Sequence, residues 1–293
     1  MTMNLPALYI DLLKKTLINE IYIENEIKLF YLVDCLVNEQ EIQGPWLIDP
    51  DLIPDRVKQG VIKAKQIGAT AQVRRRNEKG EWVTPPDLRN ILEFAHSMIG
   101  RKRMDNLQFC IERILEEDVP GDLIETGVWR GGATVFMRGM LAAHGVDDRT
   151  VWVADSFEGV PPPTLDQDAG MHLEKAVLPV LAVSVDKVKR LFDRYNLLDD
   201  QVQFLKGWFK DTLPGAPIDK LSLLRLDGDL YESTMDALNA LYDKVSVGGY
   251  IIVDDYKSVP SCQAAVDEFR VQKGIEDELV EIDFASVYWK KTQ

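Results

Sequence analysis

Acidic residues follow two apolar runs in the second half of the chain. The tripeptide DGD at 227–229 comes directly after the leucine-rich residues 221–226, and the pair DD at 254–255 comes directly after residues 249–253. A short apolar run that is closed by a turn and flanked by helical patterns indicates a buried strand of a parallel sheet. Because ligands of open parallel sheets gather beyond the carboxyl ends of the strands, we expect these acidic side chains at one rim.

Carboxylates that are packed together repel one another, and a bound cation would relieve that repulsion. Asp227 and Asp229 are two residues apart, so their side chains can point the same way, and Asp254 and Asp255 end the neighbouring strand. Mg²⁺ prefers oxygen ligands and commonly takes a few carboxylates while it keeps several waters. The alternative is that each aspartate caps the helix after it, because helix N-termini favour acids. Two such pairs on consecutive strands favour the metal site.

Strand and helix patterns alternate from residue 121 onward, which predicts an α/β fold with a doubly wound, mostly parallel, Rossmann-like sheet. The predicted parallel strands are residues 122–125, 150–154, 202–205, 221–226 and 250–253. The predicted helices are a helix that ends near 143, then 174–195, 233–245 and 262–272. Residues 279–282 and 286–290 are predicted to close the sheet as an antiparallel pair.

The N-terminal part of the chain has helical patterns instead. These patterns cover residues 6–20, 26–38, 55–68, 87–99 (with Asp87 as a candidate cap) and 105–117. Residues 70–86 look irregular and contain Arg74-Arg75-Arg76, which is either a contact for a phosphorylated substrate or a solvated basic turn. We therefore expect residues 1–118 to form a helical extension or lid, and residues 119–293 to form the α/β domain.

Composition limits the possible partners. The formal net charge of −14 argues against nucleic acid and anionic lipid as ligands, because both would be repelled. Cys35, Cys110 and Cys262 are widely spaced and indicate neither a disulfide framework nor a zinc cluster. The N-terminus does not look like a secretion signal, and the longest apolar segment, residues 27–37, is too short to span a bilayer. We expect a cytoplasmic protein.

The turn ETGVWRGG, residues 125–132, follows the first predicted strand and is rich in glycine, which allows close approach of a ligand to the backbone. It does not match G-x-G-x-x-G, the dinucleotide fingerprint. Glu125 would repel a pyrophosphate but could pair with an ammonium group, and Asp155 at the end of the next strand could hold ribose hydroxyls. S-adenosylmethionine combines an ammonium, a ribose and a sulfonium, so it is the predicted cofactor.

Other residues could line the same site. Gly207, Trp208 and Phe209 follow the third strand and could provide an aromatic wall for adenine, although packing in the core explains the two rings equally well. His172, in a proline-rich loop, and Tyr256, beside the acidic pair, are candidate contacts of the acceptor.

Several motifs together resemble the macrocin O-methyltransferase family, which methylates sugar hydroxyls in the biosynthesis of macrolides, aminocoumarins and other natural products. The matching segments are LYIDLLKKTL, MIGRKRMDNL, DLIETGVWRGG, ADSFEGVP, GWFKDTLP, LRLDGDLYEST and IIVDDY. They span nearly the whole chain in the same order, and only residues 35–85 are longer than we expect of the family.

The resemblance implies a class I methyltransferase that depends on S-adenosylmethionine and Mg²⁺. Asp227, Asp254 and Asp255 look like the metal ligands, and Asp229 looks like the general base. Met98 and Ile99 resemble the segment that covers the cofactor. The residues that fall in, or are expected to line, the cofactor site are Glu125, Thr126, Gly127, Gly131, Asp155, Ser156, Gly207, Trp208, Phe209 and Asp227.

Rival interpretations are a nucleotide-sugar or NAD-linked oxidoreductase, which should carry G-x-G-x-x-G, and a non-catalytic scaffold, which has no need for paired aspartates. Within the methyltransferase hypothesis, the acceptor is a glycosylated natural product or, as the nearest alternative, a catechol-type vicinal diol. The N-terminal helices could cover a neighbour's site, so we expect a homodimer or higher homo-oligomer. Arg225 is expected to be a buried strand arginine paired with an acid.

Overall fold

The computed structural model describes residues 4–85, 88 and 91–293, which form two compact units. One unit contains residues 11–102, and the other contains residues 4–10 with 103–293. Helix α1 (Leu5–Leu17) and helix α5 (Arg101–Glu116) each have residues in both units. The predicted domain boundary after residue 118 lies just beyond α5. No helix of the described residues is long and apolar enough to cross a membrane.

The unit of residues 11–102 is built around helix α2. Ile27, Tyr31 and Cys35 follow one another at a spacing of four residues, so they lie on one face of the helix and form its small core with Ile53 and Val61. The elements of this unit are α2 (Ile23–Val37), α3 (Gly44–Ile48), η1 (Pro50–Leu52), α4 (Asp55–Gln66), β1 (Arg75–Arg76) and β2 (Trp82–Val83).

Two expectations for this unit were wrong. The segment around Arg75–Arg76, predicted to be irregular, contains the antiparallel pair β1 and β2. Residues 91–99, predicted to be helical, form turns and irregular structure. The reason lies in their hydrogen bonds, because the backbone N–H of His96 donates to the carbonyl of Leu17 and the side chain of Glu93 accepts from Ala95 N–H. The candidate cap Asp87 lies outside the described residues.

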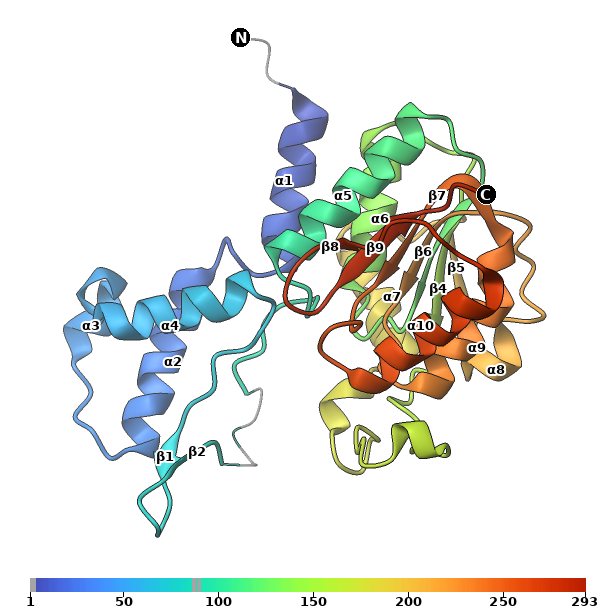
Figure 1. Ribbon diagram of the computed structural model, residues 1–293. Helices are drawn as coiled ribbons and strands as arrows, with labels where there is room; N and C mark the ends of the chain where they lie inside the picture. Colours follow the sequence, from blue (N-terminus) through green and yellow to red (C-terminus); the bar gives the residue numbers. More distant parts are fainter. Residues whose placement is uncertain (1–3, 86–87, 89–90) are drawn as a thin grey trace. The chain divides into compact units, whose positions relative to one another are not determined.

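The other unit contains a seven-stranded sheet in the order β5-β4-β3-β6-β7-β9-β8, with the first five strands parallel and the last two antiparallel (Figure 1). This confirms the predicted doubly wound fold and its closing antiparallel pair. The strands are β3 (Asp122–Thr126), β4 (Val151–Asp155), β5 (Val202–Lys206), β6 (Leu221–Leu226), β7 (Val245–Val253), β8 (Val280–Glu281) and β9 (Val287–Lys290).

Helices cover both faces of this sheet (Figure 1). On one face, Ile124, Leu224 and Ile251 pack in a single cluster with Leu238 of α9 and Phe269 of α10. On the opposite face, α6 packs against β3 and β4, and α5 contacts β7 and β9 through Phe109. The helices of this unit, besides α1 and α5, are α6 (Gly132–Ala143), α7 (Val185–Arg194), α8 (Phe209–Thr212), α9 (Tyr231–Leu241) and α10 (Pro260–Lys273).

Helix α7 is shorter than the helix predicted for residues 174–195. It begins at Val185, and the residues before it form a loop that contains a single 3₁₀ turn, η4 (Pro179–Leu181). Proline removes a backbone donor and disfavours helix for the residue before it, so the helical pattern could not extend back across Pro179. The region beside the strand ends therefore holds a long loop.

Candidate functional site

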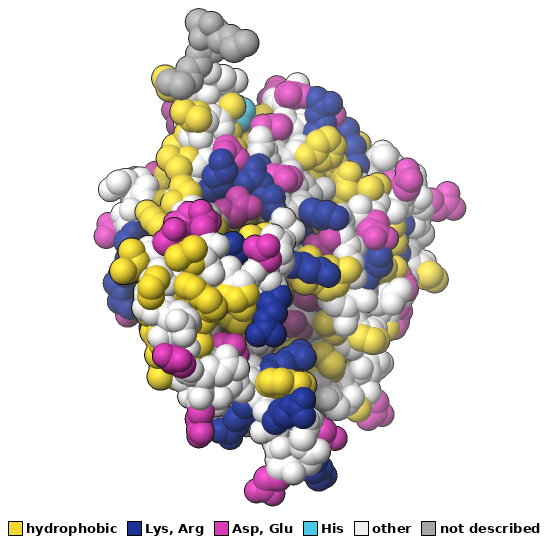
Figure 2. All heavy atoms as spheres, turned by 90° about the vertical axis from the view of Figure 1, so that its left-hand side faces the viewer, with side chains coloured by type: hydrophobic (Ala, Val, Ile, Leu, Met, Phe, Trp, Pro, Cys, Tyr) yellow, Lys and Arg dark blue, Asp and Glu magenta, His cyan; other side chains and the backbone are white. Residues whose placement is uncertain are grey.

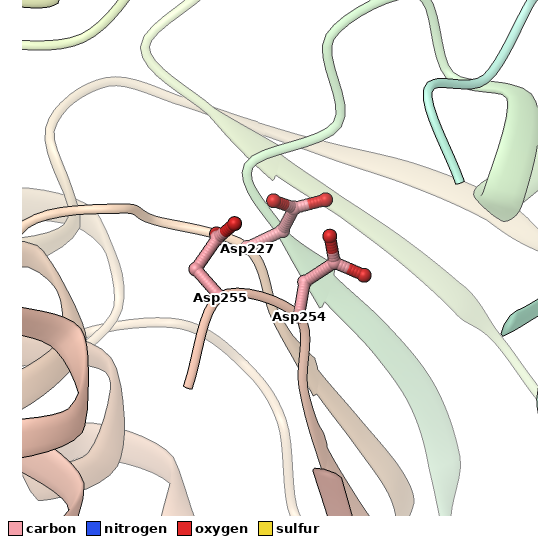
Figure 3. Close-up of side chains that lie close together, drawn as sticks. All are labelled: Asp227, Asp254 and Asp255. Carbon is pink, nitrogen blue, oxygen red and sulfur yellow. The ribbon is translucent and has the colours of Figure 1, made fainter. Parts of the chain in front are cut away.

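The carboxylates predicted from the sequence converge at the carboxyl ends of β6 and β7 (Figure 3). Asp227 follows β6, and Asp254 and Asp255 follow β7. One oxygen of each lies within 4.8 Å of one oxygen of each of the others. The strand ladder continues into these residues, since Asp227 N–H donates to Thr126 and Asp254 N–H donates to Leu226. The paired strands therefore fix where the three side chains begin.

This cluster fits a divalent cation. Asp255 Oδ2 is buried and has no hydrogen-bond partner among the described residues. The pKa values of Asp254 and Asp255 are raised, chiefly because burial removes water from the carboxylates and also because neighbouring acids repel their charge. An unpartnered buried oxygen beside two further carboxylates is the donor set that Mg²⁺ or a similar hard ion prefers.

Asp229 lies next to this cluster but is not one of its three members. Its backbone has a φ of +57°, a left-handed conformation that is uncommon for a residue other than glycine. Burial, followed by the charges of Asp227 and Asp254, raises its pKa to about 7. A carboxylate with a pKa near neutrality can accept a proton efficiently at physiological pH.

Buried arginines compensate the acidic rim. Arg225 is fully buried and its guanidinium bonds to Glu125, to Asp227 at 2.7 Å and to Asp254. This confirms the expectation of a buried strand arginine paired with acid, although the sequence indicated neither the number nor the identity of its partners. Arg103 of α5 donates to the other oxygen of Asp254 at 2.6 Å. Sequence reasoning missed Arg103, because 151 residues separate it from its partner.

The glycine turn after β3, residues 125–132, lies against the end of β6, where Asp227 is located. Gly127 has a φ of +89°, and a Cβ at this position would lie 1.9 Å from the backbone oxygen of Asp227. Gly131 also has a positive φ, and a Cβ there would lie 2.6 Å from a methyl group of Val188. Only glycine fits at these positions, so the turn follows the end of β6 closely.

Glu125 and Asp155 occupy the ends of β3 and β4, as predicted. Glu125 Oε2 is buried and has no hydrogen-bond partner among the described residues, and burial raises the pKa of this carboxyl to about 8. Both oxygens of Asp155 accept backbone N–H groups, from Phe157 at 2.6 Å and from Val128 at 2.8 Å. Asp155 therefore fastens the glycine turn to β4, while Glu125 keeps one free acceptor.

Comparison with known proteins places these features in a family. The family model described as macrocin-O-methyltransferase (TylF) matches residues 6–291. The chain belongs to this family. The confirmed resemblance covers almost the whole chain, and it makes the protein an S-adenosylmethionine-dependent methyltransferase.

Similar proteins include named enzymes and a solved structure. Demethyldecarbamoylnovobiocin O-methyltransferase of Streptomyces niveus is 56% identical over 223 residues, which are 74% of this chain and 80% of that enzyme. Mycinamicin III 3''-O-methyltransferase of Micromonospora griseorubida is 55% identical over 68% of this chain and 79% of that enzyme. The structure of the O-methyltransferase NovP is 44% identical, has a TM-score of 0.75 and covers 98% of this chain and 100% of that one.

Other predicted cofactor residues of this methyltransferase lie around the same strand ends. Thr126 is buried at the end of β3, and the Ser156 hydroxyl donates to the carbonyl of Gly159 after β4. Gly207 follows β5, where its N–H donates to the carbonyl of Asp155. Trp208 is half-buried. Phe209 packs against the hydrophobic core, which is the alternative to an adenine contact given above for this ring.

The remaining predicted residues of this methyltransferase are Tyr256, His172, Met98 and Ile99. The Tyr256 hydroxyl donates to Asp267 at 2.6 Å, and its ring packs against the core. His172 is exposed in the loop between β4 and α7. Met98, which is 40% exposed, and the buried Ile99 belong to the unit of residues 11–102. Their prediction as a cover for the cofactor remains a prediction.

Asp168 is a further residue that the sequence did not single out. It is fully buried in the loop between β4 and α7, and it accepts the N–H groups of Tyr231 at 2.7 Å and Glu232 at 3.1 Å. Helix α9 has no side-chain cap from its own N-cap residue, Leu230. Asp168 therefore caps α9 from 63 residues away and fixes this loop beside the turn that carries Asp229.

Proposed function

We propose that this protein transfers the methyl group of S-adenosylmethionine to a sugar hydroxyl of a glycosylated natural product, with a divalent cation, Mg²⁺, at Asp227, Asp254 and Asp255. The observation that carries this proposal is the convergence of those three carboxylates within 4.8 Å beside the glycine turn. A protein that only bound the cofactor would have no use for a buried, unpartnered oxygen at the neighbouring strand end.

The relatives support a sugar acceptor. One of them, 53% identical over 68% of this chain and 76% of its own length, is named as a 4'-O-methyltransferase of a dimethoxy-rhamnosyl tetracenomycin from Streptomyces olivaceus. On the face in Figure 2, basic side chains lie among acidic and hydrophobic ones and do not form one continuous basic surface. The formal net charge of −14 also suits a small neutral acceptor better than a polyanion.

We assign the cofactor to the turn of residues 125–132 and the end of β4. S-adenosylmethionine supplies an activated methyl group on a sulfonium. Glu125 Oε2 is the free acceptor that would bind the ammonium of the cofactor. Asp155, the last residue of β4, would bind the ribose hydroxyls of the cofactor. Arg225 already pairs with Oε1 of Glu125, so a bound ammonium would supply a partner for the second carboxylate oxygen.

We assign the general base to Asp229. A bound divalent ion supplies positive charge that favours the alkoxide form of a nearby hydroxyl. Asp229 takes the proton of the acceptor hydroxyl on its carboxylate oxygen, and the acceptor oxygen forms a bond to the methyl carbon as the carbon–sulfur bond breaks. Burial raises the pKa of Asp229, which suits a group that must hold this proton and then release it to water.

The substitution Asp229→Asn tests this assignment. It keeps the size of the side chain but removes the base, so turnover should fall by about 10²- to 10⁴-fold. Binding of S-adenosylmethionine, measured by calorimetry, should stay close to that of the wild type. Asp219→Asn, at an exposed position, is the matched control and should remain active. A fully active Asp229→Asn enzyme would exclude this residue as the base.

Removal of metal tests the other half of the proposal. Dialysis against EDTA should abolish methyl transfer, and added Mg²⁺ should restore it, because the three carboxylates then regain their cation. Undiminished turnover in excess EDTA would exclude a metal-dependent mechanism.

We also propose that the protein is a homo-oligomer and that residues 1–118 are a helical extension of the domain of residues 119–293. The support is the exposed apolar stripe of α1, where Leu5, Leu8 and Leu12 are each at least half exposed. A stripe at helical spacing favours burial against a partner. Light scattering on the purified chain would measure the stoichiometry, and a monomer would exclude the oligomer.

A further inference from the structure

Arg225 is the centre of the charged network under the candidate metal site. It lies on β6 and is 1% exposed, and its partners come from three adjacent strands. Nη1 donates to Glu125 of β3 and to Asp227 after β6, and Nη2 donates to Asp254 after β7. A guanidinium is planar and always charged, so one side chain can hold several carboxylates at fixed angles.

Asp254 is held by a second arginine from outside the sheet. Arg103 Nη1 donates to Asp254 Oδ2 at 2.6 Å, while Arg225 holds Oδ1. The Ser286 hydroxyl also donates to the backbone carbonyl of Asp254. Both oxygens and the main chain of this aspartate are therefore fixed.

The far side of Arg103 is fixed as well. Its Nε donates to Asp283 at 2.8 Å, and its guanidinium lies over the ring of Phe284 at 5.4 Å. Asp283 in turn accepts the N–H groups of Ala285 and Ser286. The loop between β8 and β9 thus supports Arg103, which supports Asp254.

These contacts determine how Asp254 can meet a cation. Each carboxylate oxygen has two lone pairs, and each arginine uses one of them. The Ser286 hydroxyl also lies 3.4 Å from Oδ1, so Oδ2 keeps the freer lone pair, and the plane of the carboxylate cannot rotate freely. Partners of this kind orient metal ligands, and their loss typically weakens metal binding by about 10- to 100-fold.

We propose that Arg225 and Arg103 are positioning residues that fix the carboxylate of Asp254 in the orientation that binds the divalent cation. This inference rests on the proposed metal-dependent function. It assigns a role to two residues, Arg225 and Arg103, that hold the carboxylate without themselves touching the ion.

The test is direct titration of the full-length variants Arg225→Lys and Arg103→Lys with MgCl₂ by calorimetry. Lysine keeps the positive charge but cannot form the planar fork, so the exchange isolates orientation from charge. Each variant should bind Mg²⁺ about 10- to 100-fold more weakly than the wild type. For Arg103→Lys, the apparent KM for Mg²⁺ should rise while turnover at saturating Mg²⁺ returns toward the wild-type value.

Arg138→Lys is the matched control. Arg138 is a buried arginine of α6 that makes a bidentate pair with Asp199, and it contacts none of the rim carboxylates. Its exchange should leave Mg²⁺ affinity unchanged. An equal loss in this control would show a general effect of losing a buried arginine and would overturn the inference.

The remaining outcomes separate the two proposals. A wild type that binds no Mg²⁺ would overturn the proposed function and this inference with it. A wild type that binds Mg²⁺, together with lysine variants that bind it equally well, would overturn the inference alone. If Arg225→Lys does not fold, Arg103→Lys decides the question, because an unchanged affinity there means that the arginines do not orient Asp254.

Discussion

The close contact between the glycine turn and the end of β6 can be tested with Gly127→Ala. A Cβ at Gly127 would lie 1.9 Å from the backbone oxygen of Asp227, whereas contacts below 3.0 Å are not tolerated. The turn and the end of β6 must therefore move apart by about 1 Å. Since Asp227 is a proposed metal ligand, the substitution should disturb the site as well as the fold.

The expected magnitude has two parts. Alanine at a φ of +89° costs about 1–2 kcal/mol of stability, because the left-handed region is unfavourable for a residue with a Cβ. Forcing an extra methyl group into a packed position adds about 1–3 kcal/mol. A displacement of about 1 Å at a catalytic group can lower activity by about 10²-fold.

Gly145→Ala isolates the first part, the conformational cost. Gly145 has a φ of +67°, and a Cβ there would meet nothing within 4 Å, so this variant carries the conformational cost without the clash. Urea unfolding midpoints and calorimetric titration with Mg²⁺ and S-adenosylmethionine would be compared for both variants. Gly127→Ala should be the less stable and the weaker binder. Equal stability of the two variants, with unchanged Mg²⁺ binding, would refute the close approach of the turn to Asp227.

Two further predictions concern the loop beside the site and the cysteines. Asp168→Ala should destabilise the protein by about 2 kcal/mol, because it leaves two helix N–H groups without their acceptor. Asp168→Asn should destabilise the protein less, since its side-chain carbonyl can still accept a hydrogen bond. Equal urea unfolding midpoints for the two variants would contradict the capping role. Cys35, Cys110 and Cys262 are buried, and burial raises the pKa values of Cys110 and Cys262, so these thiols stay protonated at pH 8. A thiol reagent such as DTNB should label the protein only after unfolding, and rapid labelling of the native protein would count against this packing.

Much of the fold was predictable because strand patterns are local. β3, β4, β6 and the last residues of β7 contain a short, buried apolar run that a turn closes, so these strands could be located without tertiary information. Helical periodicity was less reliable in the loop before α7 and in residues 91–99. In these segments a proline and long-range hydrogen bonds, such as that from His96 to Leu17, outweigh the local pattern.

The sequence by itself determined which residues lie at the carboxyl ends of the strands, because strand ends and side-chain alternation follow from local spacing. Asp227, Asp254 and Glu125 were found in this way. Only the tertiary structure decided which arginines bind these carboxylates. Arg225 donates to Glu125, 100 residues away in the sequence, and Arg103 donates to Asp254, 151 residues away. A pairing across such a separation depends on strand register and on how a helix packs on the sheet. The local spacing of residues does not show which distant side chains these two features bring together.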